Sequence, residues 1–184
     1  MIAVDANGAD EGAATVAAGA RAAGVEVTIY GPAAEIGDGP DVVDAPDWIT
    51  NEEEPVRAVR SRPQASVVQA ARAVAEGRAQ AVVSPGSTGA LLAASMLHIK
   101  RMRGVHRPAV ALLLPVPGKP TLMLDVGANV DVRPEHLVQF AYLGAAFMEA
   151  VHGVERPRAG LLNIGEEPTK GTEDHVAAYE RLAA

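Results

Sequence analysis

Ala-Val-Val-Ser-Pro-Gly-Ser-Thr-Gly-Ala (81–90) is a hydrophobic strand pattern that ends in a turn of small residues and then opens a helix. The same succession recurs in Leu-Met-Leu-Asp-Val-Gly-Ala-Asn-Val-Asp (122–131) and in Leu-Leu-Asn-Ile-Gly-Glu-Glu (161–167). In open α/β sheets, ligands bind outside the carboxyl ends of the strands, and the helix N-termini that follow suit anions. We therefore expect these three polar strand ends to converge on one anionic substrate.

Strand and helix patterns alternate along the rest of the chain. Strands are expected at 2–4, 25–30, 42–43, 79–84, 110–114, 121–126 and 158–164, and helices at 13–23, 66–77, 90–102, 134–153 and 172–184. This alternation predicts an α/β fold with a doubly wound, mainly parallel sheet. The proline-rich residues 31–63 are expected to be loop around one short strand. The Pro-rich connection after residue 114 predicts an antiparallel excursion from the parallel order.

The composition excludes several classes of protein. The chain has 184 residues, no cysteine and a net charge of −7. An acidic chain does not suit nucleic acid, which requires a basic face. Without cysteine there is neither a disulfide nor a thiolate metal site nor a cysteine acyl-enzyme, in keeping with a reducing cytoplasm. The amino terminus lacks the pattern of a signal peptide, and the apolar runs are too short to span a bilayer. At most, peripheral membrane contact is expected.

The first candidate loop is Pro85-Gly86-Ser87-Thr88-Gly89. The hydroxyls of Ser87 and Thr88, together with backbone N–H groups, suit an anion, and Gly89 permits close approach of the backbone. A simple turn in which Ser87 or Thr88 caps the helix explains the pattern as well.

The second candidate loop, 125–131, places two carboxylates and an amide around one turn. Asp125 and Asp131 have structural alternatives, as a turn acceptor and a helix cap. The amide of Asn129 is suited to a hydrogen bond with a ligand carbonyl or phosphate. Of the histidines, only His136, beside this loop, is a candidate for the site.

The third candidate loop is Asn163-Ile164-Gly165-Glu166-Glu167-Pro168-Thr169-Lys170-Gly171. Lys170 supplies a cation near a helix start, which is a usual pairing for bound phosphate. The alternative is a surface lysine that pairs with Glu166 or Glu167. Asn163, Gly165 and Glu166 join Lys170 as candidate site residues.

Metal and nucleotide motifs are missing from the sequence. No pair of histidines has the spacing of a zinc site, and the glycines at 8 and 12 do not make a dinucleotide fingerprint. Gly118-Lys119 is followed by Pro120 rather than Ser or Thr, so it is not a P-loop. We expect neither a metal nor a cofactor.

The motifs taken together resemble a known family. They are, in order, Ile-Ala-Val-Asp-Ala-Asn-Gly-Ala-Asp (2–10), Glu54-Pro55 with Ala58-Val59-Arg60, Ala-Val-Val-Ser-Pro-Gly-Ser-Thr-Gly-Ala (81–90), Gly-Lys-Pro-Thr (118–121), Leu-Asp-Val-Gly-Ala-Asn-Val-Asp (124–131), Pro-Glu-His-Leu (134–137) and Leu-Leu-Asn-Ile-Gly-Glu-Glu (161–167). As a set they resemble the bacterial phosphate acyltransferases that make acyl phosphate for phospholipid synthesis. The series covers nearly the whole chain.

The resemblance implies a fold, a reaction and partners. The fold would be like those of isopropylmalate dehydrogenase and phosphotransacetylase. The reaction would move a fatty acyl group from acyl carrier protein to orthophosphate, after which a membrane-bound acyltransferase would pass it to glycerol 3-phosphate. The resemblance further implies a homodimer that is cytoplasmic or loosely held at the inner face of the plasma membrane.

The chain departs from the family pattern in three places. Asn7 and Ala9 stand where the family usually has Met and Gly, and Pro85 and Ser87 stand where Ala and Asn are usual. In addition, a family member would continue for a long second part. Residues 1–184 are therefore expected to be the amino-terminal α/β part of such an enzyme, truncated and inactive or nearly so alone.

For the chemistry, we assign Lys170 to phosphate, Ser87 and Thr88 to the anion cradle, and Asn129 to the thioester carbonyl as a donor. Two alternatives remain at this point. One is a short-chain phosphotransacetylase that uses acyl-coenzyme A, and the other is a non-catalytic remnant that only binds phosphate.

Overall fold

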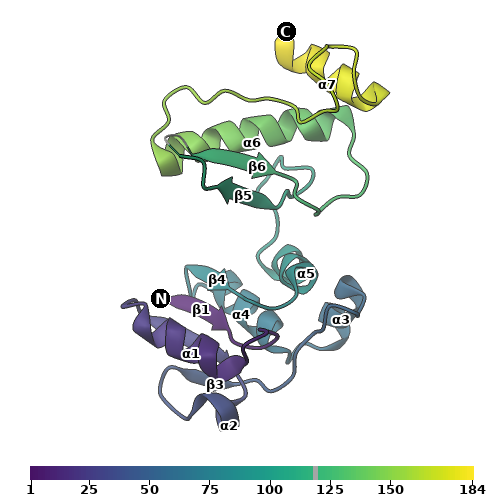
Figure 1. Cartoon of the computed structure of the whole chain (residues 1–184). Helices are drawn as coiled ribbons and strands as arrows, with labels where there is room; N and C mark the ends of the chain where they lie inside the picture. The colour runs from purple at the N-terminus through teal and green to yellow at the C-terminus, as the bar shows by residue number, and fades with distance from the viewer. Residues whose placement is uncertain (118–119) are drawn as a thin grey trace. The chain divides into compact units, whose positions relative to one another are not determined.

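The computed structural model describes residues 1–117 and 120–184, and the chain divides into two units, Met1–Lys100 and Arg101–Ala184 (Figure 1). Each unit is built around its own sheet. The expected Gly118-Lys119 feature lies outside the described residues. In the described part of the chain, no helix has the length and apolar character needed to cross a membrane.

A four-stranded parallel sheet organises the first unit. Its strands are β1 (Ile2–Asp5), β2 (Val27–Gly31), β3 (Val42–Asp44) and β4 (Ala81–Val83), in the order β3-β2-β1-β4. Every pair is parallel, and Ala3 of β1 lies opposite both Thr28 and Val82. The carboxyl ends of all four strands therefore lie at the same edge.

Helices cover both faces of this sheet. Val4 and Ile29 face α1 (Ala13–Ala22) and α2 (Ala33–Ile36), whereas Ala3 and Tyr30 face α4 (Ser66–Ala75). This alternation follows from the two-residue period of a strand. A third buried cluster joins α4 to α3 (Pro55–Ser61) and α5 (Thr88–His98). The predicted α/β fold with a mainly parallel, doubly wound sheet is confirmed.

The second unit contains an antiparallel hairpin and two helices. β5 (Ala111–Leu114) pairs with β6 (Thr121–Leu124), and α6 (Pro134–His152) packs on β6 through Gly144, where an added Cβ would lie 2.7 Å from Leu124 Cδ1. The final helix α7 (Glu173–Ala183) contacts α6. The antiparallel pairing was predicted, but the two strands form their own sheet instead of extending the parallel one.

Two expectations about secondary structure are wrong. Residues 158–164 are not a strand, and Leu162 and Ile164 are 77% and 88% exposed. A strand needs a neighbour to pair its backbone groups, and no strand in the described ranges pairs with this segment. Conversely, α2 and α3 occupy the region 31–63 that was expected to be loop, because Pro55 begins α3 and Glu54 caps it.

Candidate functional site

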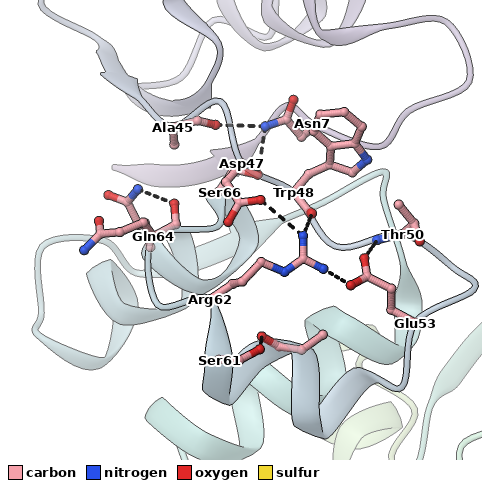
Figure 2. Close-up of polar contacts among 12 residues, drawn as sticks. Asn7, Ala45, Asp47, Trp48, Thr50, Glu53, Ser61, Arg62, Gln64 and Ser66 are labelled. Carbon is pink, nitrogen blue, oxygen red and sulfur yellow. Dashed lines mark hydrogen bonds and ion pairs between the residues drawn. The ribbon is translucent and has the colours of Figure 1, made fainter.

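The carboxyl ends of β1 and β3 are joined by the side chain of Asn7. Its Nδ2 donates to the carbonyl of Ala45, 2.9 Å away, and to Ser66 Oγ at the start of α4, 3.1 Å away (Figure 2). Asn7 is buried, so these bonds also satisfy an amide that would otherwise be costly to bury. The loop after β1 is thus attached to two neighbouring elements.

The segment that follows β3 is held by Arg62. The guanidinium donates to Asp47 Oδ1 at 3.2 Å and to the carbonyl of Trp48 at 2.6 Å, and it also pairs with Glu53 (Figure 2). Trp48 is 49% exposed beside this clamp. The clamp fixes the connection from β3 to α3 near the same edge of the sheet.

Asp5, at the end of β1, is a buried carboxylate that joins β1 to β4. It is only 2% exposed. Ser84 Oγ donates to Asp5 Oδ2 at 2.6 Å and accepts from the N–H of Gly86 at 3.2 Å, while the N–H of Asn7 donates to Asp5 Oδ1 at 3.3 Å. Burial raises the pKa of Asp5, and the hydrogen bonds from Ser66, Ser84 and Asn7 oppose that rise. No ion pair among the described residues includes this carboxylate.

The loops after β1 and β4 approach each other too closely for side chains at two glycines. A Cβ on Gly86 would lie 2.8 Å from the carbonyl oxygen of Asn7. Gly8 has a φ of 77°, and a Cβ there would lie 3.2 Å from Gly86 Cα. Glycine at both positions is therefore what permits the polar cluster of Asp5, Asn7 and Ser84 to form.

The predicted anion loop in the first unit begins α5. Ser87 is the N-cap, and its Oγ accepts from the N–H of Ala90 at 3.4 Å, so the capping alternative is realised for this hydroxyl. Thr88 is exposed in the first turn, and a Cβ on Gly89 would touch Pro55 Cγ at 2.8 Å. The N–H groups of a first helical turn have no backbone partner within the helix, so those other than the N–H of Ala90 remain suited to an anion.

In the second unit, Asn129 holds the loop after β6. Its Nδ2 donates to Asp125 Oδ1 at 2.8 Å and to the carbonyl of Pro108 at 3.0 Å, and its Oδ1 accepts from Arg107 Nη1 at 3.2 Å. Asp125 itself has a φ of 63°, in the left-handed region. Both hydrogens of the Asn129 amide are therefore engaged, and a bond to a substrate carbonyl would have to replace one of them.

His136 serves the start of α6. Its Nδ1 accepts from the backbone N–H of Arg133 at 3.1 Å, which closes a capping arrangement. Because Nδ1 accepts, the ring hydrogen of the neutral tautomer lies on Nε2. The structure gives this predicted site residue a local role at the N-terminus of α6.

The third predicted loop closes on itself around Lys170. Asn163 Nδ2 donates to the carbonyl of Lys170 at 2.6 Å, and the N–H of Lys170 donates to the carbonyl of Glu167 at 3.0 Å. A Cβ on Gly165 would lie 3.0 Å from Lys170 Cγ. Lys170 is exposed, and within the described ranges it forms no ion pair with Glu166 or any other carboxylate.

The predicted site residues are divided between the two units of the chain. Ser87, Thr88 and Gly89 belong to the first unit, and the other predicted site residues belong to the second: Asp125, Asn129, His136, Asn163, Gly165, Glu166 and Lys170. Convergence of the three loops on one substrate stays a prediction. Sequence reasoning missed Asp5 and Arg107. The available signals were a carboxylate that ends an apolar strand, and an arginine directly before a proline in a basic loop.

Comparisons with known proteins agree with the motif series. The family model described as "Fatty acid synthesis protein" matches residues 1–184. The phosphate acyltransferase of Lacticaseibacillus casei (strain BL23) is 46% identical over 195 residues, covering 100% of this chain and 57% of the relative. That of Trichodesmium erythraeum (strain IMS101) is 42% identical, over 98% of this chain and 58% of the relative. That of Heliobacterium modesticaldum is 50% identical over 142 residues.

A doubly wound parallel sheet with polar strand ends defines an α/β protein of the kind that binds ligands at the carboxyl edge of its sheet. The match along its whole length shows that the chain belongs to the fatty acid synthesis protein family. It spans about 57% of the length of the L. casei relative.

Proposed function

We propose that this protein takes part in transferring a fatty acyl group from acyl carrier protein to orthophosphate, giving acyl phosphate for the synthesis of phosphatidic acid and other phospholipids. The observation that carries the proposal is the family match over residues 1–184, together with relatives named phosphate acyltransferase. Three loops suited to anions add support.

The reaction needs positioning and charge compensation more than covalent help. A phosphate oxygen attacks the carbonyl carbon of the thioester, so a C–O bond forms and the C–S bond breaks. The thiolate leaves and takes up a proton, and nothing is oxidised or reduced. Because negative charge builds on the carbonyl oxygen and phosphate is already anionic, N–H donors and a cation are the groups that lower the barrier.

The residue roles in this proposal follow from the loops. Lys170 compensates the charge of phosphate, held in place by Asn163 and by the close packing at Gly165. The first turn of α5, with Thr88 and Gly89, supplies an anion cradle whose cap is Ser87. In the second unit, Asp125 and Asn129 shape the loop after β6. Glu166, within the third loop, and His136, at the start of α6, are further candidates to contact phosphate.

The proposed setting of the reaction follows the same family. The partners would be acyl carrier protein, orthophosphate and a downstream membrane-bound acyltransferase that acts on glycerol 3-phosphate. The protein would work as a homodimer in the cytoplasm, with at most peripheral contact at the inner face of the plasma membrane. No cofactor takes part in the balanced reaction.

The test is an assay for acyl phosphate trapped with hydroxylamine, using the protein as its gene encodes it. Acyl phosphate should form from long-chain acyl carrier protein only when orthophosphate is present. A thioester that is lost equally fast without phosphate would identify a thioesterase. Faster use of short acyl-coenzyme A would identify a phosphotransacetylase, and phosphate binding without turnover would identify a non-catalytic protein.

Lys170→Met in the same assay tests the proposed cation. A hydrogen bond to a charged group contributes roughly 1.5–3 kcal/mol, so about a ten- to hundredfold loss of activity is expected. Lys100→Met is the matched control, since Lys100 is also exposed. Equal activity in the two variants would leave Lys170 as an ordinary surface residue.

A further inference from the structure

The backbone around Arg107 is held to the second unit from both sides. Gln139 of α6 accepts from the N–H of His106 at 2.7 Å and donates to the carbonyl of Gly104 at 2.9 Å. On the other side, Asn129 donates to the carbonyl of Pro108 at 3.0 Å. The proline also restricts Arg107 to extended conformations. Two side-chain amides and a proline therefore fix the position of an exposed arginine.

Most N–H donors of the Arg107 guanidinium have no hydrogen-bond partner among the described residues. The guanidinium has five N–H donors, and its one described hydrogen bond runs from Nη1 to the neutral Oδ1 of Asn129, at 3.2 Å. No carboxylate among the described residues forms an ion pair with it. By contrast, Arg21 and Arg62 are paired with carboxylates. Arg107 is thus a positioned cation whose remaining donors suit a bidentate oxyanion.

The orientation of Asn129 is itself defined by Asp125. The carboxylate of Asp125 and the carbonyl of Pro108 are both acceptors, so they require Nδ2 on their side and turn Oδ1 toward Arg107. Asp125 adopts a φ of 63°, which costs free energy for a residue with a side chain. Its backbone N–H donates to the carbonyl of Val110 at 2.8 Å, directly before β5. A carboxylate, an amide and a guanidinium therefore form one connected chain at the open end of the hairpin.

We propose that Arg107 binds the oxyanion of orthophosphate, and that Asn129 is the positioning residue that holds the guanidinium for it. The inference rests on the proposed function and adds a second phosphate ligand besides Lys170. It gives Asn129 a role that uses the hydrogen bonds it already makes. The planar fork of arginine can donate two parallel hydrogen bonds to two phosphate oxygens, a geometry that the ammonium group of lysine does not offer.

The first experiment measures orthophosphate binding to the 184-residue chain by nuclear magnetic resonance, following the Nε–H signal of Arg107. Orthophosphate should shift this signal, and Arg107→Gln should weaken binding by about ten- to a hundredfold. Arg107→Lys should restore it only in part. Arg103→Gln is the matched control, because Arg103 is an exposed arginine of the same segment whose side chain forms no hydrogen bond or ion pair with the described residues, and it should bind as the wild type does.

The positioning role of Asn129 has its own readout. Asn129→Ala should move the Nε–H signal of Arg107 before any phosphate is added. It should also weaken phosphate binding, although Asn129 itself does not contact phosphate in this proposal. If that variant does not fold, Arg107→Gln still decides the proposal, because Arg107 is exposed. Binding by Arg107→Gln within twofold of wild type, or no phosphate response in the wild-type chain, overturns the inference.

The acyl phosphate assay separates this inference from the proposed function. In the protein as its gene encodes it, Arg107→Gln should raise the KM for phosphate and leave the KM for the acyl donor nearly unchanged. If Arg107→Gln forms acyl phosphate with an unaltered KM for phosphate, or raises only the KM for the acyl donor, the role of Arg107 is overturned and the proposed function stands. Phosphate binding through Arg107 without any acyl phosphate supports the site and contradicts the function.

Discussion

Asp5 shows how the local environment decides what a carboxylate can do. Asp41 lies on the surface beside Arg21, whose side chain lowers the pKa of that carboxyl. Asp5 is instead buried among hydroxyl and amide donors, and burial raises its pKa. Burying a carboxylate without a cation costs free energy. The ionised Asp5 therefore lowers the stability of the folded protein at neutral pH, although it connects the loops after β1 and β4.

Asp5→Asn should therefore change how stability depends on pH. As the pH rises from 3.8 through the folded-state pKa, the unfolded chain loses the proton of Asp5 first, so the wild type loses stability that the variant keeps. The difference should be about 1.4 kcal/mol for each unit by which the pKa is raised. Urea unfolding over a range of pH measures it, with exposed Asp10→Asn as the control. A difference between Asp5→Asn and wild type that does not vary with pH would contradict this account.

The local contact that could be predicted from sequence is the cap at Ser87, which was one of the two alternatives for that hydroxyl. The hydrogen bond from Asn163 to the carbonyl of Lys170 also joins near neighbours in the chain, but it was not predicted. The place of Asp5 at the end of a strand is visible in the sequence, but its hydrogen bond with Ser84 is not, because the two residues lie 79 positions apart. Arg107 likewise meets Asn129 only because the hairpin brings the start of β5 to the end of β6.

At the scale of elements, the sequence predicted most elements that have a clear apolar period, missed one helix that has only end signals, and predicted one strand that has no partner. β1, β2, β4, α1, α4 and α6 follow from apolar patterns and end signals. The helix α3 was missed although its signal is present: Pro55 begins it and Glu54 accepts from the N–H of Arg57 at 2.6 Å. The apolar run 158–164 has the pattern of a buried strand, but a strand requires hydrogen bonds from another element.

Alanine substitutions at two glycines test how tightly neighbouring elements pack against each other. Gly86→Ala should destabilise the first unit by about 1–3 kcal/mol, because the new methyl meets the fixed carbonyl of Asn7. Gly144→Ala should stay within about 1 kcal/mol of wild type, because it meets the flexible end of Leu124 and alanine favours the helix. Urea midpoints compare the two variants. A larger loss for Gly144→Ala would show that packing on the hairpin is the tighter contact.

At the scale of the whole molecule, the buried apolar residues are distributed unevenly. All three described core clusters lie in the first unit. In the described part of the second unit, the buried hydrophobic residues are Phe140, Met148 and Ala178. Several large apolar side chains of that unit are exposed: Leu112, Leu113, Val116, Val126, Val130, Tyr142, Phe147, Val151, Leu162, Ile164 and Tyr179. The two units should therefore differ in their stability when separated.

Separate expression of residues 1–100 and 101–184 tests this difference. The first fragment should unfold cooperatively in urea, because its core is complete within it. The second should bind a hydrophobic dye and self-associate, because exposed apolar patches favour association. Light scattering and dye fluorescence measure both properties. A monomeric second fragment without dye binding would show that its small core is enough.

The position of β1 in the middle of the parallel sheet has a consequence for the order of events at the ribosome. β1 is synthesised before both of its neighbours, so it can pair with β2 early, but its other edge has no partner until β4 is made, whose residue Val82 lies opposite Ala3. The hydrogen bond between Asp5 and Ser84 joins residues that lie 79 positions apart, as Ala3 and Val82 do. Pairings that are distant in sequence form slowly. The nascent chain therefore carries an open central strand until the residues of β4 have left the exit tunnel, and slower translation across residues 5–80 would lengthen its exposure to chaperones.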